Sequence, residues 1–124
     1  RTDEHLQALV RDIAEQKRNI SDVEFCAADV SFHRTLTIAA SNKMLEFLMV
    51  AIVEAVQPIS NLMVFRIRDR REIVRHHEAL LARITERDAE GAVSVLMEQM
   101  AYLRAHYERA HEERNAAQAA RRAG

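Results

Sequence analysis

The longest apolar stretch of the chain reads MLEFLMVAIVEAV, from Met44 to Val56, and it indicates the class of fold. Its apolar residues cover nearly all sides of a helix, and its only charged residues are Glu46 and Glu54. It is too short to span a bilayer, which takes about 20 apolar residues. A helix that is apolar nearly all round is typical of a protein interior. We therefore predict a central helix that Pro58 kinks or breaks, with residues 59–67 continuing for a turn or two.

The composition of the whole chain also favours helices. The 124 residues are 48% hydrophobic and 30% charged, with only two glycines and one proline. These are too few for the turns of a β-sandwich, a barrel or a doubly wound sheet. A chain of this length supports one domain. We therefore expect a single all-α domain.

Further helices are predicted on either side of the apolar stretch, from capping residues and from the helical spacing of apolar side chains. Asn42 is expected in the connection that ends one of them, because asparagine tolerates the left-handed conformation. Short connections favour an antiparallel bundle of about five to six helices over 1–110, followed by an exposed tail over 111–124. The helices run from a Thr2 or Asp3 cap to Lys17, from a capping box at Ser21-Asp22-Val23-Glu24 to Ala40, from Asp69 to Arg87, and from an Asp88 cap to Ala110.

Charge and cysteine content restrict the partners of the chain. The 18 Lys and Arg residues against 19 Asp and Glu residues give a net charge of −1, which argues against direct binding to a nucleic-acid backbone. The single cysteine, Cys26, cannot form an internal disulfide, and no secretory signal is visible, so we expect a cytoplasmic location. We do not expect an enzyme, because no phosphate loop, Gly-flanked serine or base for Cys26 is evident.

Three of the predicted helices carry polar residues on a face that is otherwise apolar. Asp29 and His33 lie four residues apart, so both side chains can reach one point. His77 and Gln99 interrupt the apolar faces of two later helices. Burial of a carboxylate and imidazoles is costly unless they are paired. Two arrangements would remove this cost, a buried hydrogen-bond network or a divalent cation bound by the carboxylate and the imidazoles.

Basic residues gather near the junction between the third and fourth predicted helices. Two interpretations stay open, a solvated turn or a cluster from which one side chain reaches inward to an anion. An arginine suits the second role, because its guanidinium binds a carboxylate through two charge-assisted hydrogen bonds. The cluster consists of Arg66, Arg68, Arg70, Arg71 and Arg75.

Two segments resemble a known family. The first reads Asp29-Val30-Ser31-Phe32-His33-Arg34-Thr35-Leu36 and is followed by Ala39-Ala40-Ser41-Asn42-Lys43-Met44-Leu45. The second reads His77-Glu78-Ala79-Leu80-Leu81-Ala82-Arg83-Ile84 and precedes Asp88 and Ala92. Together they resemble the FadR-type C-terminal (FCD) effector domain of GntR-family bacterial transcription regulators, from about Thr2 to Leu103. The resemblance implies an antiparallel helical bundle that dimerises, in a fragment that lacks the winged-helix DNA-binding domain and the family's first effector-domain helix.

The resemblance also implies a binding site. In the metal-binding branch of the family, one aspartate and three histidines hold a divalent ion such as zinc, nickel or manganese, and a small organic acid can complete the coordination. Carried over to this chain, the metal ligands are Asp29, His33 and His77, with Gln99 at the position of the third histidine. Glutamine is a poor partner for zinc beside imidazole, so this departure favours a harder ion or direct contact with an effector. Effector contacts are expected from Arg34, Asn42 and Arg66.

The sequence hypothesis is therefore a ligand-sensing and dimerisation domain of a transcription regulator. A small organic carboxylate would enter the bundle and change the packing of the helices that carry the homodimer, so DNA would be contacted only through the missing N-terminal domain. No membrane partner is expected. Two alternatives remain open, a metal-dependent enzyme built on a helical bundle and a dimerisation module with a vestigial pocket.

Overall fold

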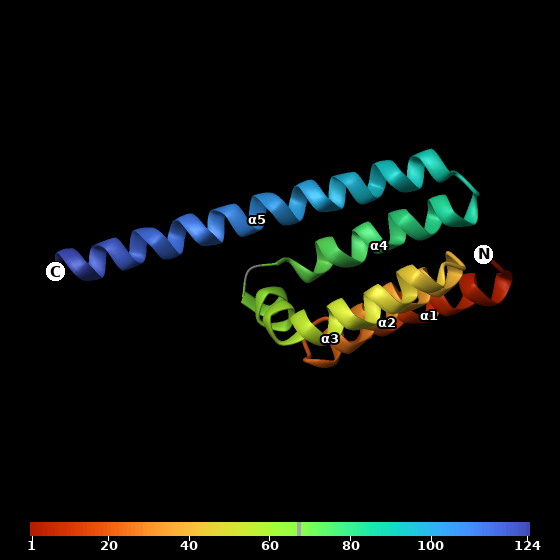
Figure 1. The fold of residues 1–124 in the computed structure, drawn as a ribbon, viewed down its shortest axis with the longest axis horizontal. Helices are drawn as coiled ribbons and strands as arrows, with labels where there is room; N and C mark the ends of the chain where they lie inside the picture. Colours follow the sequence, from red (N-terminus) through yellow and green to blue (C-terminus); the bar gives the residue numbers. More distant parts are fainter. Residues whose placement is uncertain (67) are drawn as a thin grey trace.

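Five helices make up the described part of the chain, and no strand is present there. The computed structural model describes residues 1–66 and 68–124, and it does not describe the side chains of residues 54 and 56–66. Figure 1 shows two layers, one of α1, α2 and α3 and one of α4 and α5, with α1 in contact with α4 across them. The helices are α1 (Asp3–Arg18), α2 (Glu24–Ala39), α3 (Lys43–Arg66), α4 (Arg70–Thr85) and α5 (Ala89–Ala123). The prediction of an all-α bundle is confirmed.

The hydrophobic core lies between α1, α2 and α4. Its apolar side chains are direct neighbours in sequence or lie four or seven residues apart along each helix, so each helix presents one buried face. Residues of α5 pack against the margin of this core rather than inside it. The buried members are Leu9 and Ile13 of α1, Phe25, Cys26 and Phe32 of α2, and Ile73, Val74 and Leu80 of α4.

Side chains at the helix starts agree in part with the predictions. Thr2 caps α1 in a capping box with His5, and Asp69 and Asp88 accept hydrogen bonds from amides in the first turns of α4 and α5. The capping box predicted at Ser21 is wrong, because α2 begins at Glu24 behind Val23 without a side-chain cap. The backbone carbonyls of an irregular turn at 19–23 accept from the first amides of α2, so a side-chain cap is not needed there.

The connection between α2 and α3 differs from its prediction. Ser41, and not Asn42, has the left-handed backbone conformation, with φ of 55°. The side chain of Asn42 instead accepts a hydrogen bond from the Leu45 amide and caps the start of α3. Asn42 is therefore a capping residue on the exposed side of this connection.

The predicted central position of the apolar helix is wrong for the single chain. α3 packs mainly against α2 at the edge of its layer, and Phe47 is 69% exposed and Met44 66% exposed. The helix also continues past Pro58 to Arg66, so the predicted break is wrong. The predicted kink concerns Pro58, whose side chain lies outside the described residues, so the kink stays a prediction.

The last helix is longer than predicted. α5 continues from Ala89 to Ala123, whereas the apolar pattern fades at Ala110. Figure 1 shows its C-terminal half extending beyond the end of α4. Residues 111–124 are all exposed, as expected for a tail, but they are helical up to Ala123.

Candidate metal centre

Two of the predicted ligands come from one face of α2. Asp29 and His33 are one helical turn apart, and Phe32 lies between them on the buried side. Asp29 is buried, while His33 is half-buried at the edge of the core. Oδ1 of Asp29 lies 4.0 Å from Nε2 of His33. The spacing in sequence therefore brings a carboxylate and an imidazole together, as predicted.

The third predicted ligand, His77, reaches the same point from α4. Its side chain is fully buried, and Nε2 lies 3.9 Å from Oδ1 of Asp29. The imidazole stacks on the Phe32 ring, with ring centres 4.0 Å apart and planes inclined by 15°. One ligand atom from each of Asp29, His33 and His77 lies within 4.8 Å of the others. We call these three residues the triad.

A fourth residue, Gln16 of α1, forms hydrogen bonds with two members of the triad. Its Nε2 donates to Oδ1 of Asp29 at 3.0 Å, and its Oε1 lies 2.9 Å from Nδ1 of His77. Gln16 is fully buried, and sequence reasoning did not single it out. It follows Leu9 and Ile13 on the buried stripe of α1, so it is a polar interruption of the same kind as His77.

The environment of His77 favours a neutral imidazole. Burial lowers the pKa of His77 well below its ordinary value, and the charges of His33 and Arg68 lower it further. Nδ1 faces the amide oxygen of Gln16, and an amide oxygen can only accept, so Nδ1 carries the proton. Nε2 then carries a lone pair, and it is buried without a hydrogen-bond partner among the described residues.

The donors of the triad suit a divalent transition metal. Zinc and similar ions bind neutral imidazole nitrogen and carboxylate oxygen, and both are present here. In a tetrahedral zinc site, ligand atoms lie about 3.3 Å apart, so the triad is somewhat wider than such a site. The residues present fit the ion that the sequence predicts, with three protein ligands.

Gln99 is the fourth predicted ligand, at the position of the third histidine. Gln99 is buried on α5, the helix that packs on α4, and none of the hydrogen bonds or ion pairs of the described residues joins it to the triad. Its place as a fourth ligand therefore stays a prediction.

The residues predicted to contact an effector form no hydrogen bond or ion pair with the triad within the described part of the chain. Arg34 is exposed, because it follows the inward-facing His33 and points about 100° away around α2. Asn42 caps α3 as described above. The side chain of Arg66 lies outside the described residues.

Arg68 is the arginine that acts on the triad. It is half-buried just before α4, and its Nε is buried without a hydrogen-bond partner among the described residues. Its charge is one of the causes that lower the pKa of His77. Arg68 also lines a polar pocket at this end of the bundle, beside Ser21, Asp69 and Arg71. The half-buried Arg68 is compatible with an inward-reaching member of the arginine cluster, and the anion that it would bind stays a prediction.

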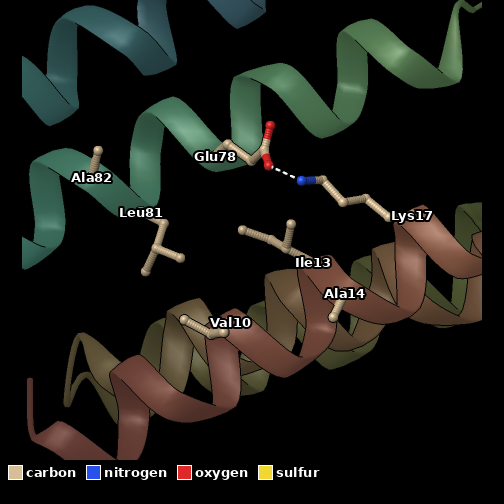
Figure 2. Close-up of a pocket in the computed structure, with 7 residues that line it drawn as sticks. All are labelled: Val10, Ile13, Ala14, Lys17, Glu78, Leu81 and Ala82. Atoms are coloured by element: carbon tan, nitrogen blue, oxygen red, sulfur yellow. Dashed lines mark ion pairs between the residues drawn. The ribbon is translucent and has the colours of Figure 1, made fainter.

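A second groove lies on another face of the bundle, between α1 and α4. Figure 2 shows its apolar lining and the ion pair between Lys17 and Glu78 at one end. It has a volume of about 370 Å³ and contains no residue of the triad. Its lining consists of Val10, Ile13, Ala14, Lys17, Glu78, Leu81 and Ala82.

Comparison with known proteins gives one match. The family model described as FCD domain matches residues 1–107, which is most of the chain and includes the triad and Gln99. Neither the curated proteins nor the solved structures contain a match to this sequence.

Proposed function

The chain belongs to the FCD domain family, and from this membership and the triad we propose that it is the effector-sensing and dimerisation domain of a GntR-family transcription regulator. FCD domains are regulatory domains, and the role proposed here is not catalytic. The effector is a small organic carboxylate that binds beside a divalent metal held in the bundle. Binding changes operator affinity through a DNA-binding domain attached to this one.

The metal ion in this proposal is inferred from one observation. Nε2 of His77 and Oδ1 of Asp29 lie 3.9 Å apart, and no hydrogen bond joins them. Because Nδ1 of His77 carries the proton, both facing atoms present lone pairs. Two buried acceptors that face each other cost free energy unless a cation lies between them. A divalent cation bound by Asp29, His33 and His77 would remove this cost.

The ion would also provide the means of binding an effector. With three protein ligands, a divalent metal keeps open positions that an effector carboxylate can occupy. Arg68 supports this role, since its half-buried guanidinium carries an unpaired Nε and its charge acts on His77. An arginine binds a carboxylate through paired, charge-assisted hydrogen bonds. We propose that the carboxylate of the effector binds both the metal and Arg68.

Dimerisation is supported by the apolar surface of the single chain. Exposed apolar side chains follow one another along α3, and large exposed apolar patches mark interaction sites. Within the described residues, no helix has the length and apolar character that crossing a bilayer requires. Among the described residues of α3, the large apolar side chains that are exposed are those of Met44, Leu45, Phe47, Leu48, Val50 and Ile52.

Metal titration tests the first step of the proposal. We expect zinc, nickel or manganese chloride, titrated into the chelator-treated chain in a calorimeter, to bind with one saturable site per chain. Asp29→Asn keeps the shape and the contact to Gln16 but removes a charged ligand, so it should weaken binding at least tenfold. His111→Gln removes an exposed imidazole outside the triad and should leave the affinity unchanged. Absence of saturable binding, or equal losses in both variants, would contradict the metal site.

Titration with a panel of small mono- and dicarboxylic acids, with and without metal, tests the second step. We expect at least one acid to bind more tightly to the metal-loaded chain. Arg68→Gln should weaken that binding at least tenfold while the metal affinity is kept. Arg71→Gln, an exposed neighbour in the same pocket, is the matched control and should have little effect. If no acid binds under either condition, the sensing role is wrong.

A further inference from the structure

We infer that Gln16 is a positioning residue of the metal centre, which fixes the tautomer of His77 so that only Nε2 can bind the ion. This inference rests on the proposed metal site and adds a residue outside the ligand set. Gln16 is fully buried and contacts both a carboxylate and an imidazole of the triad.

The hydrogen-bonding chemistry fixes the direction of the Gln16 amide. A carboxylate can only accept hydrogen bonds, so the group 3.0 Å from Oδ1 of Asp29 must be the amide NH₂. The amide oxygen is then the atom 2.9 Å from Nδ1 of His77. Because that oxygen can only accept, Nδ1 must carry the proton. Asp29 therefore determines the tautomer of His77 through Gln16.

The tautomer determines which nitrogen of His77 can bind a metal ion. The proton on Nδ1 leaves the lone pair on Nε2, which is the nitrogen that lies 3.9 Å from Oδ1 of Asp29. Metal-binding histidines usually donate their other N–H to a fixed acceptor, which sets the tautomer and the ring orientation. Here the acceptor is an amide oxygen on a different helix. Stacking on Phe32 fixes the plane of the ring, and Gln16 fixes its protonated edge.

Gln16 also makes α1 part of the metal centre. The ligands lie on α2 and α4, and among the described residues Gln16 is the residue of α1 that hydrogen-bonds to them. The next residues along each helix, Lys17 and Glu78, form an exposed ion pair between the same two helices (Figure 2). This pair lies outside the triad, so it offers a matched comparison for the contact between Gln16 and His77.

Nitrogen NMR of the metal-free chain at pH 8 tests the inference without any metal. We expect the neutral His77 ring to carry its proton on Nδ1 in the wild type. Gln16→Met removes both hydrogen bonds at similar size, and should shift the ring toward the Nε2-protonated form. Gln16→Glu keeps an acceptor toward Nδ1 and should keep the wild-type tautomer, even if Gln16→Met fails to fold. An Nε2 proton in the wild type would overturn the inference.

Metal titration of the same variants completes the test. We expect Gln16→Met to lower zinc or nickel affinity by 10- to 100-fold, the usual effect of losing such a supporting contact. Glu78→Gln removes the neighbouring exposed contact and should bind the metal like the wild type. Unchanged affinity and tautomer in Gln16→Met would overturn the role of Gln16 but leave the metal site intact. A wild type that binds no metal would instead overturn the metal site, whatever the tautomer.

Discussion

His77 shows how the burial of a single side chain makes stability depend on pH. Burial, and then neighbouring positive charges, lower the pKa of His77 well below its value in the unfolded chain, about 6.5. Between these two pKa values the unfolded state binds a proton that the folded state does not, so acid favours unfolding. We expect the free energy of unfolding of the metal-free chain to fall as the pH drops below about 6.5. Urea denaturation at a series of pH values measures this.

Two variants assign the pH effect to His77. His77→Asn offers a donor near the position of Nδ1 but does not titrate, so the decline below about pH 6.5 should become shallower, by up to about 1.4 kcal/mol per pH unit. Some decline should remain, because burial and Arg75 also lower the pKa of His76. His111→Gln, at an exposed site, should leave the profile unchanged. A wild-type stability that is flat from pH 7.5 to 5 would show that neither histidine is buried as described.

The residues of the site differ in how far the sequence can predict them. Asp29 and His33 follow from local geometry, because residues four apart share one face of a helix. That His77 joins them depends on how α4 packs against α2, and the family resemblance supplied that information. Gln16 gave no comparable signal, since a single glutamine on a helix face has many uses. Arg34 is exposed, because the residue after an inward-facing one points to the side of the helix, and its contact with an effector stays a prediction.

At the scale of helices, a carboxylate links α1 to α2 outside the triad. Asp12 accepts hydrogen bonds from Oγ of Ser31 at 2.7 Å and from Oγ1 of Thr35 at 2.6 Å. Hydrogen bonds to a charged group contribute more than neutral ones, so we expect Asp12→Ala to lower the free energy of unfolding by about 1–3 kcal/mol. Metal affinity should stay the same, because Asp12 does not touch the triad. Urea denaturation and metal titration of one preparation give both values.

The control for Asp12 lies on the same helix. Gln7→Ala changes an exposed residue of α1 and should alter stability by less than about 0.5 kcal/mol. A loss of metal affinity in Asp12→Ala would mean that α1 positions the site through its whole contact with α2, and not through Gln16 alone.

Helix boundaries were predictable where a side chain caps the first turn. Thr2 and Asp88 bond to the first amides of their helices, and both were recognised from sequence. Ser21 looked like a cap, but backbone carbonyls at 19–23 satisfy the first amides of α2. The end of α5 was missed because hydrophobic periodicity reports only the part of a helix that packs. Beyond Ala110 the helix is exposed, and it consists of residues with high helix propensity, such as Ala, Glu and Arg.

At the scale of the molecule, the largest disagreement between sequence and structure concerns α3. The sequence predicts a buried helix, but the single chain leaves its apolar side chains exposed, with Ile52 at 56% and Phe47 at 69%. Exposed apolar area is unfavourable at about 25 cal/mol per Å², so a helix of this composition needs a cover. The dimer that we propose would provide this cover, and α3 would then be buried in the dimer.

Substitution on α3 tests this interpretation. Phe47→Asp places a charge where the proposed partner would bury an aromatic ring, so it should convert a dimer into a monomer in sedimentation velocity. Because Phe47 makes little contact within its own chain, the helical content should stay the same by circular dichroism. Gln118→Asp adds the same charge to the exposed end of α5 and should remain dimeric. A wild type that sediments as a monomer at all concentrations would contradict the proposed dimer. A dimer that persists in Phe47→Asp would place the interface on another face. The exposed apolar side chains of α5 are then the next to test.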